Sequence, residues 1–367
     1  MRLQKLSPLF VLLLAACGGG GGGDNGTPAS ESRVLLERVA GSMDDRSGTT
    51  ATDPVRGCVD GPATDILLGW GRALAIAANG QTLYLDERGM CDGRYRIRQL
   101  DLATGKVTTL ATSAERPAPD APVPVQLTGF LTPSALAQAP DGTLLIADSE
   151  VFDGSLTLSS RTRPGLGNGV WALAPDGALR QVAGFAQPTG TPMADGTGAG
   201  AVFESITALC ADAQGGFYVE DLGRVRRLTA DGAVQTLADA QGQRFHQLYC
   251  GPAGQALTTV RQADGTSRLA ALPSGQTLGA WNAAMTTYAP ASAQTAWARA
   301  WTTPPALFLA DLASGEALPG AHVPLTASGE LQMAGQAYSP DPSTLRAASG
   351  EVAYLRTAYG IVRMTYR

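Results

Sequence analysis

Three aspartates stand at equivalent points of a repeated pattern and are the residues best suited to chemistry. Asp86, Asp148 and Asp221 each end a short apolar run that follows a glycine turn. Carboxylate oxygens are hard ligands that suit Ca²⁺ or Mg²⁺. An aspartate at the end of a strand also accepts N–H bonds from the turn that follows it, and we favour this interpretation for all three. No cofactor is therefore expected, and a Ca²⁺ or Mg²⁺ site formed by these aspartates is the alternative.

Other reactive side chains lack the spacing that a site needs. His246 and His322 have no metal-ligand neighbours in sequence, and neither a Gly-x-Ser-x-Gly nor a Gly-x-x-x-x-Gly-Lys motif occurs. No catalytic residue is assigned on this basis. Alternating arginines are expected on the solvated side of two strands, because side chains two residues apart share a face: Arg94, Arg96, Arg98, Arg224 and Arg226.

The composition indicates which elements position these residues. The chain has 367 residues, of which 44% are apolar and 16% charged, with 45 glycines and 23 prolines. This content allows a sizeable core and is typical of many short strands joined by tight turns. The net charge of −5 gives no electrostatic reason to bind a phosphate backbone, so nucleic acid is not an expected partner.

An internal repeat organises the chain. Residues 72–112, 134–184 and 205–239 each contain an apolar run, a glycine turn, a run ending in Asp, an alternating run, a second glycine turn and a last short run. Four antiparallel strands joined by such turns form one blade of a propeller. Weaker copies follow, and the blades are expected at about 66–112, 130–184, 203–239, 243–281, 285–323 and 343–367.

The last blade lacks its fourth strand, and the start of the chain supplies it. Residues 33–41 (RVLLERVAG) match the fourth-strand pattern of residues 178–184 (ALRQVAG). Pairing the two ends of the chain would remove the open strand edges of the ring. The predicted fold is therefore all-β, a six-bladed β-propeller of four-stranded antiparallel blades over 33–367, closed by a strand at 33–40.

The third unit resembles the NHL repeat. The resemblance lies in the runs Asp195–Phe203 (DGTGAGAVF), Gly216–Asp221 (GFYVED), Val225–Leu228 (VRRL) and Val234–Ala238 (VQTLA). Phe130 and Phe203 precede first strands and are expected to fill the gaps between blades. Six-bladed lactonases of the gluconolactonase class are similar in architecture. That similarity implies an alternative function, a divalent-metal-dependent hydrolase or lyase with its ion in the central channel.

The first residues have the form of a lipoprotein leader. Residues 1–16 combine Arg2 and Lys5 with an apolar run, and Leu14-Ala15-Ala16-Cys17 resembles the lipobox of bacterial lipoproteins. The resemblance implies lipidation of Cys17 and a cell-envelope protein anchored to the outer membrane, facing the periplasm. Residues 17–32, with their glycine tract, then form a flexible tether. An ordinary cleavable signal with a chance cysteine is the alternative.

Four cysteines remain in a compartment that permits disulfides. Cys58 and Cys91 fall before and within the first blade, and Cys210 and Cys250 fall late in the first strands of consecutive blades. These positions predict the pairs Cys58–Cys91 and Cys210–Cys250. Four buried free thiols are the alternative.

Connection lengths predict which face of the propeller binds. The long segments 41–66, 113–130, 151–168, 185–203 and 324–342 all emerge on one face, while short glycine turns occupy the other. Insertions confined to one face of a repeat protein usually mark its binding face, although they could only plug the channel. We therefore expect a monomeric, membrane-anchored binding module whose loop-rich face meets an envelope protein or a glycan, rather than an enzyme. The ligand itself is not identified by the sequence.

Overall fold

The computed structural model describes most of the chain from Ser32 onward. The described residues are 32–41, 58–66, 68–69, 71–89, 91–114, 129–149, 168–184, 191–212, 214–238, 242, 245–251, 254, 256–261, 267–280, 285–292, 294–300, 305–314, 316–333, 336–338, 340–349, 351–357 and 360–367. The expected leader, the lipidation site Cys17 and the glycine tether lie outside them. Among the described residues, no helix has the length and apolar character needed to cross a membrane.

The first three blades follow the repeat seen in the sequence. Their strands are β3 (Leu74–Ile76), β4 (Thr82–Arg88), β5 (Tyr95–Asp101) and β6 (Lys106–Thr112); β7 (Pro133–Gln138), β8 (Leu144–Asp148), β9 (Gly169–Leu173) and β10 (Leu179–Ala183); and β12 (Ile206–Ala211), β13 (Phe217–Asp221), β14 (Arg224–Leu228) and β15 (Ala233–Thr236).

The other three blades repeat the arrangement. Their strands are β16 (Phe245–Cys250), β17 (Ala256–Arg261), β18 (Ser267–Ala271) and β19 (Gln276–Ala280); β20 (Met285–Pro290), β21 (Thr295–Ala300), β22 (Ala306–Asp311) and β23 (Ala317–Pro324); and β26 (Pro340–Ala347), β27 (Val352–Thr357), β28 (Gly360–Tyr366) and β1 (Val34–Ala40).

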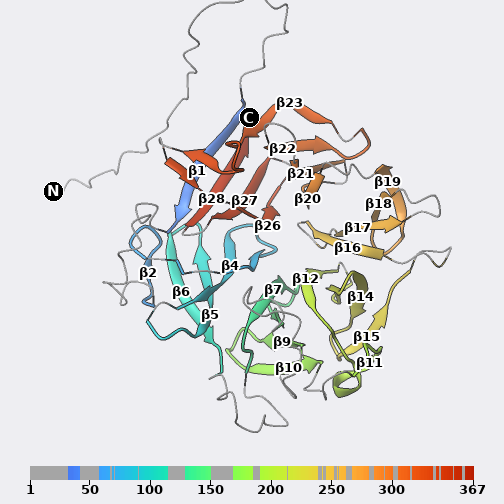
Figure 1. The fold of residues 1–367 in the computed structure, drawn as a ribbon. Helices are drawn as coiled ribbons and strands as arrows, with labels where there is room; N and C mark the ends of the chain where they lie inside the picture. Colours follow the sequence, from blue (N-terminus) through green and yellow to red (C-terminus); the bar gives the residue numbers. More distant parts are fainter. Residues whose placement is uncertain are drawn as a thin grey trace, which may run out of the picture.

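Each blade is an antiparallel sheet whose strands follow chain order from the centre outward, except that an earlier segment supplies the outermost strand in the first, third and sixth blades. The six sheets form a ring with their first strands innermost (Figure 1). Glycine turns at Gly80, Gly142 and Gly232 adopt positive φ values of 67°, 88° and 88°, which only glycine reaches without a steric cost. The predicted fold class, an all-β six-bladed propeller, is confirmed.

The N-terminal strand closes the ring. β1 pairs with β28 in antiparallel register from Val34↔Tyr366 to Ala40↔Ile361, so it becomes the outermost strand of the sixth blade. Arg356 of β27 also crosses to the first blade, where its Nη2 donates to the carbonyl oxygen of Gly69 at 2.7 Å. The two ends of the chain are therefore joined both by a strand ladder and by a buried arginine.

Three small elements were not expected. β2 (Gly61–Pro62) pairs with β6 and β11 (Gly196–Thr197) pairs with β15, so the first and third blades have five strands. A separate hairpin, β24 (Leu331–Met333) and β25 (Gln336–Tyr338), precedes the last blade. All three lie in the connections that lead from one blade to the next.

The core lies between the blades because each sheet buries both of its faces. In β8, Leu145 and Ala147 pack with residues of the third blade, whereas Leu144 and Ile146 pack with those of the first. Alternate side chains of a strand point to opposite faces, so nearly every residue of β8 is apolar. Phe130 and Phe203 are 0% and 5% exposed and pack in these same seams, as expected.

Candidate functional site

The three predicted aspartates are buried and accept backbone N–H bonds. Asp86 Oδ1 accepts the N–H groups of Arg72 and Ala73, each at 2.7 Å. Asp148 accepts those of Leu131 and Thr132 through separate oxygens, at 2.9 and 2.6 Å. Asp221 Oδ1 accepts those of Glu204 and Ser205, at 2.9 and 2.8 Å. The three aspartates are 0%, 3% and 0% exposed.

These bonds correct one detail of the expected capping role. Capping was expected at the turn that follows the second strand, but the donors lie where the chain enters the first strand of the same blade. Each donor pair ends one long connection: residues 41–73, 113–132 or 184–205. The aspartates therefore anchor the inner ends of three long connections.

The fourth and fifth blades have short entering connections and no carboxylate at the position of these aspartates. Asp148 and Asp221 pair in the ladder with the first residue of the inner strand, Pro133 or Ile206. Val260 and Ala300 occupy this ladder position in the fourth and fifth blades. The connections that enter those two blades are short, spanning residues 237–244 and 281–284. In the first three blades the carboxylate therefore accompanies a long connection. The sixth blade differs, because residues 325–339 lead into it and Thr357 occupies the equivalent position.

Replacing Asp148 with Asn tests this anchoring role. The amide keeps one acceptor oxygen, so one of two buried N–H groups loses its partner, and we expect the free energy of unfolding to fall by about 2 kcal/mol. Urea denaturation measures the change. Millimolar Ca²⁺ should leave the melting temperatures of both proteins unchanged. A calcium-dependent rise that disappears in Asp148→Asn would identify Asp148 as a metal ligand instead.

Buried arginines hold the outer parts of two of these connections. Arg226 is 0% exposed, and its two terminal nitrogens contact Asp221 Oδ2 and Asp195 Oδ1, both at 2.9 Å. Arg98 is 1% exposed and donates to Glu87 Oε2 at 3.3 Å and to the carbonyl oxygen of Val59 at 2.7 Å. The expectation that these arginines lie on a solvated face is wrong.

The same two connections are fastened by a second aspartate. Asp60 accepts the backbone N–H and the hydroxyl of Thr109 at 2.9 and 2.8 Å. Asp195 accepts the same two groups of Thr236, both at 2.9 Å. Asp60 precedes β2 and Asp195 precedes β11, so each fixes a fifth strand to its blade.

The two faces of the ring differ in the length of their connections. On the short-turn face, which carries the first-to-second and third-to-fourth strand turns, every connection has four or five residues, from 77–81 to 348–351. The loop face carries all other connections. Its four longest segments, 41–73, 113–132, 149–168 and 184–205, are connections that enter or lie within the first three blades, and a shorter one, 325–339, enters the sixth.

A cavity of about 250 Å³ opens at the centre of the short-turn face. Small residues at the ends of inner strands line much of it: Ala75, Ala77, Ala137, Ala211 and Ala347. Its polar side chains are engaged within the protein: Gln138 donates to the Tyr84 hydroxyl at 2.7 Å, and Asp212 pairs with Arg227 at 2.8 Å. The three predicted aspartates lie at the other ends of the blades.

Glu220, a titratable residue of the second strand β13, was not singled out in the sequence analysis. Glu220 lies between the third and fourth blades, where its Oε2 accepts the N–H of Leu248 at 3.0 Å. Burial raises the pKa of Glu220 to about 7, although the Leu248 N–H and the Thr207 hydroxyl oppose this shift. Thr207 is exposed at a bulge of the innermost strand β12. Nothing in the run FYVED distinguishes Glu220 from an outward-facing residue.

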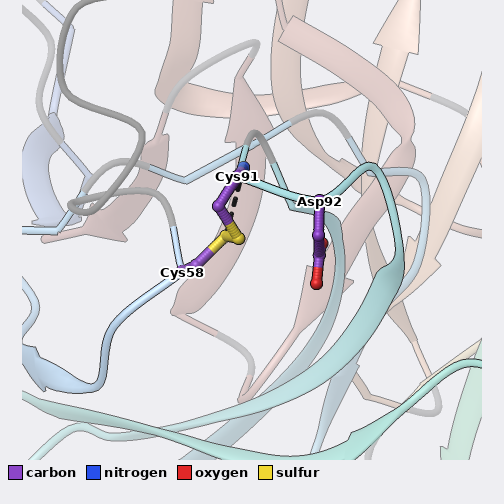
Figure 2. Close-up of side chains that lie close together, drawn as sticks. All are labelled: Cys58, Cys91 and Asp92. Atoms are coloured by element: carbon purple, nitrogen blue, oxygen red, sulfur yellow. Dashed lines mark hydrogen bonds between the residues drawn. A yellow bond between two sulfur atoms is a disulfide. The ribbon is translucent and has the colours of Figure 1, made fainter.

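The structure contains two disulfides, as the cysteine content predicted. They are Cys58–Cys91, on the loop face, and Cys210–Cys250, which joins inner strands β12 and β16. Within the described ranges, the one group of three or more Cys, His, Asp or Glu with metal-ligand spacing is Cys58, Cys91 and Asp92 (Figure 2). While the disulfide is closed, only Asp92 of this group carries an anionic oxygen, and that carboxylate is paired with Arg96 at 2.8 Å.

Comparisons with known proteins support the fold and go no further. No family model matches the chain, and no curated protein does. A structural genomics protein of unknown function from Bacteroides thetaiotaomicron VPI-5482 matches with a TM-score of 0.50 and 12% identity, over 91% of this chain and 76% of its own.

Two lyases are also similar in structure. A streptogramin B lyase has a TM-score of 0.43 and 11% identity, over 91% of this chain and 98% of its own. Virginiamycin B lyase from Staphylococcus aureus has a TM-score of 0.44 and 10% identity, over 90% and 99%. The six four- or five-stranded antiparallel blades described above identify the chain as a six-bladed β-propeller.

Proposed function

We propose that this protein is a lipid-anchored binding module of the bacterial envelope. Its binding surface is the half of the loop face over the first three blades, and its partner is another envelope protein or a glycan. Buried aspartates and arginines support this assignment because they hold long connections in place there. A rigid scaffold that presents anchored loops is the usual basis of a recognition surface.

The exposed residue Leu222 is the main evidence for this binding surface. Leu222 is 47% exposed and has a φ of 44°, which makes it the sole non-glycine residue with positive φ in the part of the chain that the structure describes. It forms a two-residue turn with Gly223 between β13 and β14, on the loop face. Such turns favour Asn-Gly, whereas a left-handed conformation costs most L-residues about 1–2 kcal/mol.

Leucine at this turn therefore lowers stability and exposes apolar surface. Residues held in such conformations concentrate at functional sites. Val59, also on the loop face, is 40% exposed. Of the three large hydrophobic residues exposed among the described positions, two therefore lie on the proposed surface, and the third is Leu110 of the outer strand β6. An apolar contact between Leu222 and the partner would explain why this turn carries leucine where asparagine is favoured.

The direction of the tether supports the same surface. A fourth strand runs from the short-turn face to the loop face, so β1 begins on the short-turn face. Arg33, just before it, donates its N–H to the carbonyl oxygen of Gly320 at 2.7 Å. An anchor attached through the preceding residues would hold the short-turn face toward the membrane and leave the loop face free to bind.

Replacing Leu222 with Asn separates binding from folding. We expect the free energy of unfolding to rise by about 1 kcal/mol because asparagine tolerates the left-handed conformation. The amount of this variant that detergent-solubilised envelope or purified peptidoglycan sacculi retain should be at least tenfold lower than the amount of unmodified protein. Leu110→Asn, which also removes one exposed leucine, should leave retention unchanged. Equal retention of both variants and the unmodified protein would refute the proposal.

A further inference from the structure

The Cys58–Cys91 disulfide lies beside a positive charge. Cys91 is exposed and Cys58 is half-buried, so a reagent in solvent can reach the bond. Arg96 places its Nη2 3.5 Å from Cys91 Sγ. The backbone N–H of Cys91 points at Cys58 Sγ from 3.3 Å (Figure 2). Each sulfur therefore has a donor group that would stabilise it as a thiolate.

Arg96 is held in this place by its surroundings. Its Nη2 also donates to Asp92 Oδ2 at 2.8 Å, and the side chain of Arg96 is only 10% exposed. The Arg96 guanidinium, hydrogen-bonded to Asp92, holds the pKa of that carboxyl below its ordinary value, so the ion pair persists at neutral pH. Gly89 leaves the space that the guanidinium fills, because a Cβ there would lie 1.9 Å from Arg96 Nη1.

The other disulfide has different surroundings. Cys210 is 2% exposed, and Cys250 Sγ lies 3.2 Å from the carbonyl oxygen of Leu209. A carbonyl lone pair repels a developing thiolate, whereas a guanidinium attracts it. A nearby cation lowers the pKa of a thiol, and a thiol of lower pKa leaves faster in disulfide exchange. The two bonds therefore differ in leaving group. They also differ in exposure, because Cys91 is exposed whereas Cys250 is half-buried and lines the central cavity with Cys210.

We propose that Cys58–Cys91 is a thiol–disulfide exchange site whose co-reactant is a dithiol. The incoming thiolate attacks Cys58 Sγ, a mixed disulfide forms, and the electron pair of the broken S–S bond passes to Cys91 Sγ, which leaves as a thiolate beside Arg96. The second thiol of the reagent then attacks its own sulfur in the mixed disulfide and releases Cys58. The protein is reduced to two thiols and the dithiol is oxidised to a disulfide.

Opening the Cys58–Cys91 disulfide would affect a connection on the loop face. Cys58 directly precedes Val59 and Asp60, which bind Arg98 and Thr109 and so fasten β2 to the first blade. Opening the bond removes the covalent tie between this connection and the Cys91 loop. The exchange chemistry depends on the residues around the two sulfurs and is independent of what the loop face binds.

Graded reduction of the full chain tests the site. The protein is treated with dithiothreitol at pH 7 and quenched with iodoacetamide at intervals, and each opened pair is quantified by peptide mass spectrometry. We expect Cys58–Cys91 to open at least tenfold faster than Cys210–Cys250. In urea the two rates should converge, because the difference arises from folded surroundings. Equal rates in the folded protein, or faster opening of Cys210–Cys250, would overturn the proposal.

Variants isolate the role of Arg96. Arg96→Gln should slow the opening of Cys58–Cys91 about threefold to tenfold, because the leaving thiolate loses its cation. Gly89→Ala, which keeps the charge but displaces it, should slow opening in the same direction. Arg94→Gln is the matched control, since Arg94 donates to the carbonyl oxygen of Ser113 rather than to either sulfur. Unchanged rates in both test variants, or equal slowing in the control, would exclude a role for the guanidinium.

Discussion

Replacing Asp221 with Ala is expected to lower the free energy of unfolding by about 4 kcal/mol. Asp221 Oδ2 lies 2.9 Å from Arg226 Nη1, and both side chains are fully buried. Without Asp221, the buried Arg226 keeps only Asp195 as an anionic partner, and the Asp195 side chain is 44% exposed. Breaking a buried ion pair costs about 3–5 kcal/mol. Two N–H groups, those of Glu204 and Ser205, also lose their acceptor. Guanidinium denaturation at neutral pH measures the loss.

A second variant separates the charge from the hydrogen bonds. In Asp221→Ala combined with Arg226→Met, the only charge that loses its partner is Asp195, which is 44% exposed. No unpaired charge is then buried, so part of the lost stability should return. The exposed pair Glu37–Arg363, at 3.6 Å, is the control, and Glu37→Ala should cost less than about 1 kcal/mol. A loss of only about 1 kcal/mol in Asp221→Ala would show that solvent reaches Arg226 and that this anchor is weak.

The second large effect is expected in the pH dependence of stability. Burial raises the pKa of Glu220 from 4.5 to about 7. The folded protein therefore binds more protons than the unfolded chain between these values, and the stability present below pH 4.5 is lost as the pH rises through 7. A shift of this size corresponds to about 3 kcal/mol of differential stability at pH 8.

Glu220→Gln removes this titration and keeps an acceptor for Leu248. Its free energy of unfolding should match that of the unmodified protein at pH 4 and exceed it by about 3 kcal/mol at pH 8. Glu87, whose pKa burial also raises to about 7, is present in both proteins and cancels from this difference. A difference that stays constant between pH 4 and pH 8 would place Glu220 in contact with solvent.

The architecture could be predicted because its signals are local. Gly80, Gly142 and Gly232 mark tight turns, and the apolar runs between turns match strands that are buried on both faces. The closing strand was predicted from the similarity of residues 33–41 to residues 178–184, and β1 pairs with β28 as expected. Such patterns involve residues that are close together in the chain, so a single sequence is enough to detect them.

The roles of the charged side chains could be predicted only in part. An aspartate at the end of a second strand was expected to accept N–H bonds, and Asp86, Asp148 and Asp221 do so, although their donors lie 13 to 17 residues earlier rather than in the adjacent turn. Arg96, Arg98 and Arg226 were expected on a solvated face but are buried, whereas Arg94 is exposed as expected. Alternation shows which residues share a face, but it does not show whether that face meets solvent or another chain segment.

By itself, the sequence determined the repeat, the number of blades and the position of the closing strand, because these follow from periodicity and turn chemistry. Only the tertiary structure decided that Arg226 meets Asp195 across 31 residues and that Glu220 packs against Leu248 of the fourth blade. The physical reason is that burial and charge pairing depend on which segments meet when the ring closes. That information lies in the packing of blades against one another and in no local stretch of residues.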